Sequence, residues 1–302
     1  MIYITGANGR LGKEVLKLLP EAIPLVRKKS GSKKEIVTDF SEKELKEILK
    51  NAKIMVHLAG SMNFLDHNEL WETNVKLTER IVNSLPKNSK IIFSSSISVY
   101  GKRIAELPAD EKTKINPDTP YSKSKDFAEK IISKHKNYVI LRIGTIYGKG
   151  FEDYYMILKM IEKGNMYLIG DGENKIPFVH VEDVAYAIKN AINRGKGIYV
   201  LTGECKKQRE IIDMASSELK VKTVLKRVPE SFALMFAKAE EIGAKMEKRK
   251  PKITQEHIMV LSSDRDFDCS KAKKELNFKP RKIEKGIREM VKNYKNKRSR
   301  RE

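Results

Sequence analysis

The chain has 302 residues and a formal net charge of +21, from 61 Lys and Arg against 40 Asp and Glu. A chain of this length buries about three quarters of its unfolded surface, so its core needs no disulfide or metal. Its two cysteines, Cys205 and Cys269, exclude a disulfide framework and a cysteine-rich zinc module. They fit a reducing compartment, so we expect a cytoplasmic protein. Only two glutamines accompany many Lys and Glu, a composition typical of thermophiles.

Apolar periodicity predicts alternating strands and helices in the first half of the chain. The expected strands are 2–5, 23–26, 54–58, 90–94 and 138–143, and the expected helices are 11–19, 42–49, 70–85 and 121–134. This alternation predicts an α/β fold, a Rossmann doubly wound parallel sheet with helices on both faces. No apolar run approaches the roughly 18 residues of a membrane-spanning helix. A strand and glycine turn by residue 6 leave no room for a signal peptide.

The chain becomes helix-rich and basic after Gly203, which predicts a smaller, mostly helical C-terminal substrate lobe. We expect residues 1–150, with about 178–203, to form a dinucleotide-binding domain. Residues from about 151 to 177, with 204–290, would form the substrate lobe, and 291–302 a basic tail.

A glycine-rich turn follows the first predicted strand and opens the first predicted helix. Gly6, Gly9 and Gly12 stand three residues apart in this turn. The first glycine allows a tight turn, the second removes a side chain where a pyrophosphate approaches the backbone, and the third lets helix and strand pack closely. The helix N-terminus offers unpaired N–H groups and a positive dipole end to phosphates. The turn therefore predicts dinucleotide binding.

The end of the second predicted strand indicates which dinucleotide binds. A site for NAD carries a carboxylate about 20 residues after the first glycine, where it binds the ribose 2′-hydroxyl. This chain has Leu25-Val26-Arg27-Lys28-Lys29 there, without a carboxylate. Arg27 and Lys28 could instead pair with a 2′-phosphate, because a guanidinium matches phosphate geometry. We expect NADP; the alternative interpretation is a pair of solvated basic side chains.

Tyr121 and Lys125 are four residues apart, which places both on one face of a helix. An ammonium beside a phenol stabilises the phenolate and lowers the tyrosine pKa, which suits proton transfer to and from a carbonyl or alcohol oxygen. Upstream, a predicted strand runs into Ser94-Ser95-Ser96, where a hydroxyl could hydrogen-bond the same oxygen. The Tyr–Lys spacing alone is common by chance. Its combination with the glycine turn and the serine strand end, in this order, is specific.

Together these motifs resemble the extended short-chain dehydrogenases/reductases, also called the NAD-dependent epimerase/dehydratase superfamily. The resemblance covers nearly the whole chain and rests on Thr5–Gly12, Asp39-Phe40, His57–Gly60, Asn74-Val75, Ser94–Gly101, Tyr121–Lys125, Leu141–Gly148 and Phe178–Ala185. It implies that Ser96 is the catalytic serine, because the family's serine also lies 25 residues before the tyrosine. It further implies that Tyr121 is the acid/base, and that Lys125 holds the nicotinamide ribose and tunes Tyr121.

The resemblance also implies the cofactor contacts. Asp39 would face the adenine, Leu58 to Gly60 would line the pyrophosphate and ribose path, and residues 142–147 would pass near the nicotinamide. The expected cofactor-binding residues are Gly6, Asn8, Gly9, Arg10, Leu11, Gly12, Arg27, Lys28, Asp39, Phe40, Leu58, Ala59, Gly60, Ser94, Tyr121, Lys125 and Ile143. The five histidines show no metal-ligand spacing, so we expect no metal. The family also suggests a homodimer through the helices around 70–85 and 121–134.

Two reactions are open within this family, and both act on a small-molecule substrate. Sugar-nucleotide members carry an arginine that clamps the substrate pyrophosphate, but here the matching place is Ile176, beside Lys175. The stretches 251–254, 265–272 and 275–278 look more like hydroxysteroid dehydrogenases and dihydroflavonol-type reductases. We therefore favour an NADP-dependent ketone/alcohol oxidoreductase. The alternative is a nucleotide-sugar epimerase or dehydratase, similar to UDP-glucose 4-epimerase.

Charge and amphipathicity leave two further interpretations. The tail 292–302 reads KNYKNKRSRRE and is either a solvated end or a weak contact for nucleic acid or an anionic membrane surface. With the +21 charge it keeps open a non-catalytic, cofactor-binding or RNA-associated protein, which the intact Ser96, Tyr121 and Lys125 set disfavours. Residues 231–246 are amphipathic. They would form a helix packed on the second lobe, a lid over an apolar substrate or a membrane-surface contact.

Overall fold

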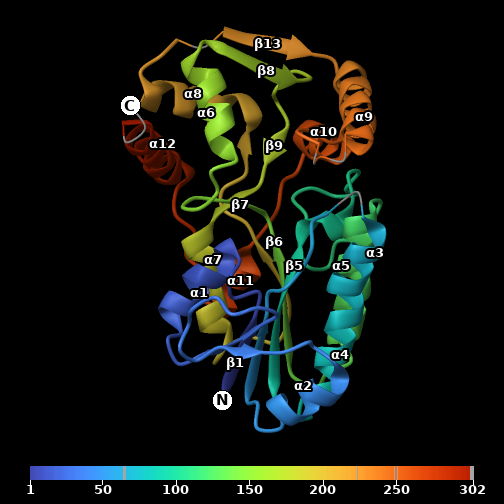
Figure 1. The fold of residues 1–302 in the computed structure, drawn as a ribbon. Coiled ribbons are helices and arrows are strands. Elements are labelled where there is room, and N and C mark those ends of the chain that lie inside the picture. Colours follow the sequence, from blue (N-terminus) through green and yellow to red (C-terminus); the bar gives the residue numbers. More distant parts are fainter. Residues whose placement is uncertain (64–65, 223, 248, 250, 300–302) are drawn as a thin grey trace.

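A computed structural model describes residues 1–299, except 64, 65, 223, 248 and 250, and shows two stacked lobes (Figure 1). The larger lobe holds a seven-stranded sheet in the order β11-β6-β5-β4-β1-β2-β3, with every neighbouring pair parallel. The strands are β1 (Ile2–Thr5), β2 (Ile23–Val26), β3 (Ile36–Val37), β4 (Ile54–His57), β5 (Lys90–Ser96), β6 (Tyr138–Ile143) and β11 (Gly197–Leu201). The predicted Rossmann-type parallel sheet is confirmed.

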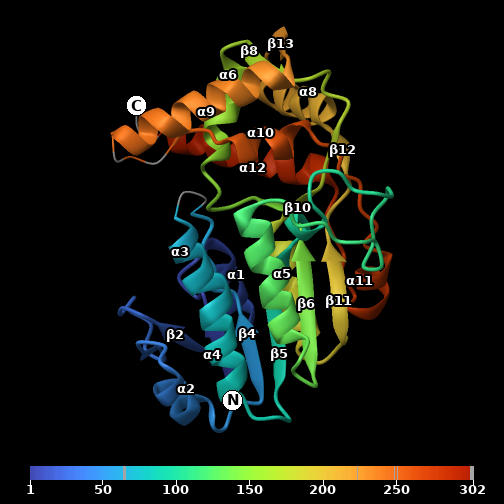
Figure 2. The ribbon, with the colours of Figure 1, turned by 90° about the vertical axis from the view of Figure 1, so that its right-hand side faces the viewer.

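Helices cover both faces of this sheet, as the alternation predicts (Figures 1 and 2). One face packs against α1 (Arg10–Leu18), α7 (Val181–Ala191) and α11 (Ser270–Glu275). The other packs against α2 (Glu42–Leu49), α4 (Leu77–Ser84) and α5 (Pro120–Ile132). The strands of a parallel sheet are buried on both sides, and segments such as Ile91-Ile92-Phe93 are accordingly apolar without interruption.

The helix expected over 70–85 is broken into three pieces. It consists of α3 (His67–Trp71), a π-helical turn η1 (Glu72–Lys76) and α4. Asn74 lies in this turn and is almost fully buried. Its side chain donates to Ser124 Oγ at 2.9 Å and to the Ser61 carbonyl at 3.1 Å. A π-turn inserts a residue that apolar periodicity alone does not reveal, and such turns often occur at functional sites.

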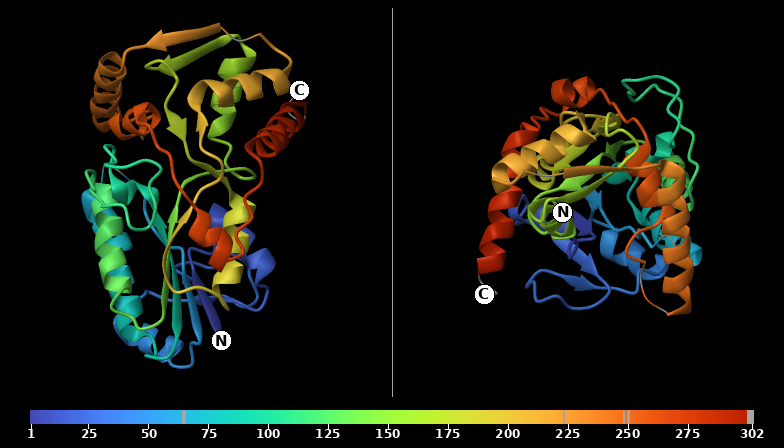
Figure 3. Two further views of the ribbon diagram at one scale, coloured as in Figure 1. Left: turned by 180° about the vertical axis from the view of Figure 1, so that it is seen from behind. Right: turned by 90° about the horizontal axis from the view of Figure 1, so that it is seen from above.

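The smaller lobe is built mainly of helices, as expected from the basic second half (Figures 1 and 3). Its elements are α6 (Tyr154–Glu162), β8 (Asn165–Ile169), β9 (Lys175–Ile176), β12 (Lys206–Lys207), α8 (Gln208–Leu219), β13 (Val224–Val228), α9 (Glu230–Met246), α10 (Gln255–Ser262) and α12 (Ile283–Ser299). Strands β7 (Thr145–Tyr147) and β10 (Phe178–His180) pair at the junction of the lobes. A separate apolar cluster joins α6, α8 and α12.

Two segments differ from the domain assignment expected from the sequence. Helix α11 falls within the range assigned to the substrate lobe, yet Ala272 and Leu276 are buried in the core cluster of the large sheet. The expected basic tail begins inside α12, where Val291 and Tyr294 are buried. Residues 300–302 of that tail lie outside the described residues. None of the described helices is both long enough and apolar enough to cross a bilayer.

A buried ion pair fixes α5 on the sheet. Glu129 of α5 and Arg142 of β6 are each 4% exposed. The guanidinium donates from Nη2 to Glu129 Oε2 at 2.8 Å and from Nε to Oε1 at 3.1 Å. Ser95 Oγ donates to the same carboxylate at 2.5 Å, and Arg142 Nη1 donates to the Tyr100 hydroxyl at 2.9 Å. Several hydrogen bonds thus satisfy both buried charges.

Removing one partner of this pair should leave a buried, uncompensated charge. We expect Glu129→Gln to lower the free energy of unfolding by about 3–5 kcal/mol. The control is Lys46→Ala on α2. Its side chain is 60% exposed and that of its partner Glu42 is 41% exposed, so the loss should stay below about 1 kcal/mol. Urea unfolding of both variants measures the difference, and equal losses would contradict the assigned role of the pair.

Candidate active site

The glycine turn between β1 and α1 leaves no room for side chains. Gly6 has a φ of +70°, and a Cβ there would lie 2.6 Å from Ala59 N; a Cβ on Gly12 would lie 2.2 Å from the Gly6 carbonyl oxygen. Gly9 caps α1 without a side-chain hydrogen bond. The first-turn N–H groups of α1 are therefore available to an anion.

The segment after β4 lies against the glycine turn. Leu58 N donates to the Thr5 carbonyl at 3.3 Å, and Ala59 N donates to Thr5 Oγ1 at 3.3 Å. A Cβ on Gly60 would lie 3.1 Å from Asn74 Oδ1 and 3.2 Å from Lys125 Nζ. A larger side chain at this position would therefore crowd Asn74 and Lys125.

Other expected cofactor residues follow the ends of β2 and β3. Arg27 and Lys28 are exposed after β2, and no carboxylate stands beside them in the chain. Asp39 Oδ1 accepts a hydrogen bond from Ser41 N at 2.6 Å, which holds the pKa of the Asp39 carboxyl below its usual value. Phe40 is buried at a φ of +61°.

Further residues of the expected cofactor set contact other side chains of this protein. Arg10 lies at the start of α1, pairs with Asp153 at 2.5 Å and stacks over the Phe151 ring at 4.8 Å. Leu11 packs on the large core, and Ile143 is buried in it at the end of β6. Asn8 is exposed in the glycine turn.

Ser96, Tyr121 and Lys125 are brought together where β5 ends and α5 begins. Ser96 hydrogen-bonds the Tyr121 phenol and also accepts from Ser98 N at 3.1 Å, at the start of the short helix η2 (Ile97–Tyr100). Lys125 Nζ lies 6.0 Å from the Tyr121 ring centroid and donates to the Ser94 carbonyl at 2.9 Å. The phenol and the ammonium are therefore neighbours on one helix face.

The tyrosine pKa moves opposite to the sequence-based expectation. Burial raises the pKa of Tyr121 to about 12, although the Ser96 hydrogen bond acts to lower it. Burial also lowers the pKa of Lys125 to about 8, while the nearby Glu129 carboxylate favours its charged form. Burial sets the direction of the Tyr121 pKa shift, and the Lys125 ammonium, which was expected to lower this pKa, is held at the Ser94 carbonyl instead. Tyr121 is therefore a protonated phenol at neutral pH.

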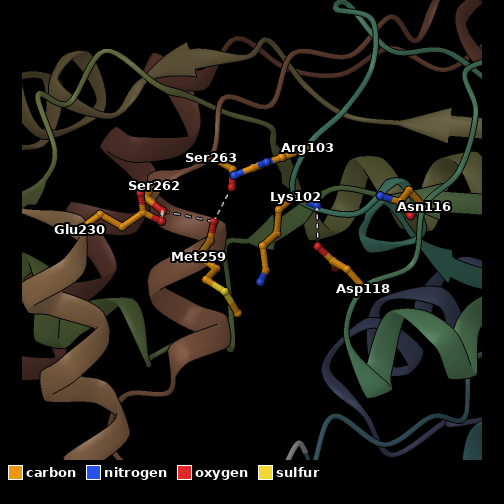
Figure 4. Close-up of a pocket in the computed structure, with 8 residues that line it drawn as sticks. All are labelled: Lys102, Arg103, Asn116, Asp118, Glu230, Met259, Ser262 and Ser263. Atoms are coloured by element: carbon orange, nitrogen blue, oxygen red, sulfur yellow. Dashed lines mark hydrogen bonds between the residues drawn. The ribbon is translucent and has the colours of Figure 1, made fainter.

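A hollow of about 510 Å³ opens between the lobes, and neither Ser96, Tyr121 nor Lys125 is among its lining residues (Figure 4). Lys102 points into it, between Met259 of α10 and Asp118 of the loop before α5. The lining residues are Lys102, Arg103, Asn116, Asp118, Glu230, Met259, Ser262 and Ser263. A narrower extension shares Lys102, Asp118 and Met259 and reaches Thr119, which caps α5.

The small lobe contributes a carboxyl and a guanidinium to this extension. Thr119 Oγ1 donates to Glu256 Oε1 at 3.1 Å, and burial raises the pKa of Glu256 to about 7. Arg265 is 4% exposed and donates from Nη2 to the Ile97 carbonyl at 3.1 Å. Within the described residues, Arg265 Nε and Ser98 Oγ are buried without a hydrogen-bond partner. Unsatisfied buried donors of this kind suit an oxygen-bearing ligand.

Comparison with known proteins identifies the family. The model of the NAD dependent epimerase/dehydratase family matches residues 2–201, about two thirds of the chain. The chain belongs to this family. It is an enzyme, an NAD(P)-dependent oxidoreductase, epimerase or dehydratase of the extended short-chain dehydrogenase/reductase type.

Individual relatives of this family member are named for two different kinds of substrate. A "Putative UDP-glucose 4-epimerase" of Methanocaldococcus jannaschii is 29% identical over 252 residues, which cover 72% of this chain and 82% of that protein. A sterol-4-alpha-carboxylate 3-dehydrogenase (decarboxylating) of Dictyostelium discoideum is 24% identical and covers 64% of this chain and 68% of its own. The crystal structure of gox2253 superposes with a TM-score of 0.77 at 26% identity, covering 98% of both chains.

The residues of this epimerase/dehydratase family member fit a dinucleotide. The N-terminus of α1 has no side-chain cap. Glycines occupy the positions of the turn where a Cβ would collide with neighbouring backbone atoms. Within the described residues, no group of three or more His, Cys, Asp and Glu could hold a metal ion.

Sequence reasoning missed several residues of the site. Asn74 was part of a recognised motif but received no role, since its π-turn leaves no periodic signal. Glu256 lies 135 residues after Tyr121 in sequence, so no local pattern connects them. Glu129 could have been found, because it follows Lys125 by four residues on the same helix face.

The raised pKa of Glu256 predicts a pH-dependent stability. The folded carboxyl binds its proton more tightly than the unfolded one, so its contribution is complete below about pH 4.5 and is lost as the pH rises through about 7. The difference in unfolding free energy between wild type and Glu256→Gln should therefore fall by about 1–3 kcal/mol between acidic and mildly alkaline pH. Urea unfolding at several pH values measures it. Glu79→Gln, with a side chain 46% exposed, is the control and should show a much smaller change.

Proposed function

We propose that this enzyme transfers a hydride between NADP and the carbon of a secondary alcohol or ketone. The main supporting observation is the hydrogen-bonded Ser96–Tyr121 pair, with Lys125 one helical turn further along α5. The uncapped N-terminus of α1 supports cofactor binding. The protonated Tyr121 phenol is the form that a ketone reductase needs before it donates a proton.

Each residue then has a defined part. A bound nicotinamide supplies or accepts the hydride. In reduction, Tyr121 gives its phenolic proton to the carbonyl oxygen as the hydride reaches the carbonyl carbon, and the product is an alcohol. In oxidation, the hydroxyl proton returns to the Tyr121 oxygen as the hydride leaves. Ser96 orients the substrate oxygen, and the Lys125 ammonium holds the ribose hydroxyls and favours the transient phenolate.

The glycine turn and the ends of the neighbouring strands would hold the rest of the cofactor. The pyrophosphate would lie at the glycine turn, against the N–H groups at the start of α1. Asp39 and Phe40 would border the adenine, Leu58 to Gly60 the pyrophosphate and ribose path, and Ile143 the nicotinamide. Exposed Arg27 and Lys28 after β2 would pair with the 2′-phosphate of NADP.

A nucleotide-sugar epimerase or dehydratase is the second candidate. The M. jannaschii relative and the polar donors around Glu256 and Arg265 favour it. Ile176 opposes it, because this buried apolar side chain stands where sugar-nucleotide members carry an arginine. Neighbouring Lys175 is already paired with Asp266 at 2.5 Å.

Location and assembly complete the proposal. Both cysteines are free thiols, which suits a reducing cytoplasm. A homodimer would form through α3–α4 and α5, where the exposed rings of Trp71 and Phe127 lie 4.9 Å apart. The residues before the basic C-terminus belong to α12, and contact of this end with nucleic acid stays a prediction.

Cofactor preference gives the first test of this function. NADPH should bind at least about tenfold more tightly than NADH, and Arg27→Ala should remove about 10–100-fold of the NADPH affinity while leaving NADH unchanged. Lys33→Ala is the control, because this exposed lysine lies in the same loop. Fluorescence titration measures the affinities. Denaturation followed by mass spectrometry shows any retained dinucleotide; tightly retained NAD would contradict this proposal and favour the epimerase.

The phenol gives the second test. Tyr121→Phe should lower turnover by about 10²–10⁴-fold and leave the affinity for NADPH unchanged. Turnover is followed as NADPH absorbance with a panel of ketones, secondary alcohols and UDP-sugars. Tyr186→Phe, at an exposed position of α7, is the matched control and should keep full turnover. A Tyr121→Phe enzyme with wild-type turnover would exclude the assigned role of Tyr121.

A further inference from the structure

Helix α9 presents its large apolar side chains to solvent and its small ones to the protein. Its inward side is made of Ala233, Ala237 and Ala244, which are at most 7% exposed. The large residues point outward: Phe232 is 57% exposed, Met235 61%, Phe236 63%, Ile242 55% and Met246 80%. An amphipathic helix that only packs on its own protein buries its large apolar residues, so this orientation is the reverse of the ordinary one.

These five residues form one continuous stripe, called here the α9 stripe. At 100° per residue they fall within an arc of about 120° along the helix. The helix runs along the outer side of the small lobe, where the views from the front and from above both show it at the surface (Figures 1 and 3). Single exposed apolar residues are ordinary, but a contiguous row of this length marks an interaction surface.

The charges of α9 are sorted around the stripe. Glu240 accepts hydrogen bonds from Arg249 Nη1 at 2.5 Å and from Lys252 N at 2.9 Å. Glu241 accepts from Gln255 N at 2.8 Å. The acidic side chains near the middle of the helix are thus engaged by the chain that follows it.

Lysines accompany the stripe instead. Lys238 and Lys245 are exposed and lie along one flank of it. Lys226 and Arg227 of β13, which leads into α9, are exposed as well. The surface therefore combines apolar anchors with accessible positive charge, on a chain whose net charge is +21.

We propose that the α9 stripe docks the enzyme on an anionic lipid surface. An apolar face with flanking lysines matches the acyl boundary and headgroups of such a bilayer, where both kinds of contact add. A two-fold contact with a second copy would instead bring Lys238 and Lys245 of both copies to one seam. The carboxylates of Glu240 and Glu241 could not relieve that repulsion, because they already have partners.

The docked orientation has a consequence for the interlobe hollow. Glu230, the first residue of α9, lines the hollow and accepts a hydrogen bond from Ser262 at 2.8 Å. At 100° per residue Glu230 lies on the opposite side of α9 from the stripe, so the hollow would open on the side of the helix away from the bilayer. The docking rests on the exposed stripe and its charges and does not depend on the proposed reaction.

Vesicle co-sedimentation of the full chain tests this proposal. The wild type should sediment with vesicles that contain about 30% phosphatidylglycerol, and only weakly with pure phosphatidylcholine. Phe232→Ser with Phe236→Ser should weaken this binding by about tenfold or more, because the two phenyl groups that would enter the bilayer are lost. Lys238→Glu with Lys245→Glu should remove the preference for anionic vesicles.

Matched controls separate docking from folding and self-association. Met156→Ser with Tyr186→Ser replaces two exposed apolar residues elsewhere and should leave vesicle binding unchanged. The thermal unfolding and NADPH affinity of the Phe232/Phe236 variant should match the wild type, since the replaced side chains are exposed. The proposal is overturned if the wild type stays in the supernatant, or if the variant binds vesicles equally well. It is also overturned if light scattering shows that the variant has lost a dimer that the wild type forms.

Discussion

The buried pair of Glu129 and Arg142 is the constraint on which the site depends. It ties α5 to β6, and Ser95 of β5 donates to the same carboxylate, so one helix and two strands share a single polar contact. The same helix face carries Tyr121 and Lys125, so a shift of α5 along the sheet would separate the phenol from Ser96. Glu129 also favours the charged form of Lys125 against burial. Architecture and electrostatics therefore come from one interaction.

The parts of the fold that could be predicted are those with local causes. The glycine turn follows from backbone geometry, and the spacing of Tyr121 and Lys125 follows from the helical repeat. Sequence does not reveal the pKa of Tyr121, because it depends on how deeply neighbouring elements bury the phenol. Glu256 and Arg265 likewise reach the site only through packing of the small lobe. The segment 231–246 is a helix as expected, but only the structure shows that its large apolar side faces outward.

The interlobe region places two groups of opposite charge, Arg265 and Glu256, close to each other. Arg265 is a buried guanidinium that, within the described residues, donates hydrogen bonds only to the backbone carbonyls of Ile97 and Gly101. Glu256 lies near enough that each charge influences the pKa of the other group. Burial favours the neutral form of both, so the pair is sensitive to whatever displaces water from the extension. A substrate oxygen at this place would meet groups whose hydrogen-bonding capacity is not yet used.

The chain passes between the lobes many times, after Gly150, Ile176, Gly203, Ser263 and Phe278. The two lobes are therefore connected by several segments of the chain and not by one linker. A wide hinge-like swing of one lobe would have to bend the chain at each of these crossings. For the same reason neither lobe corresponds to a continuous stretch of the sequence, and no single cut in the chain would separate the two.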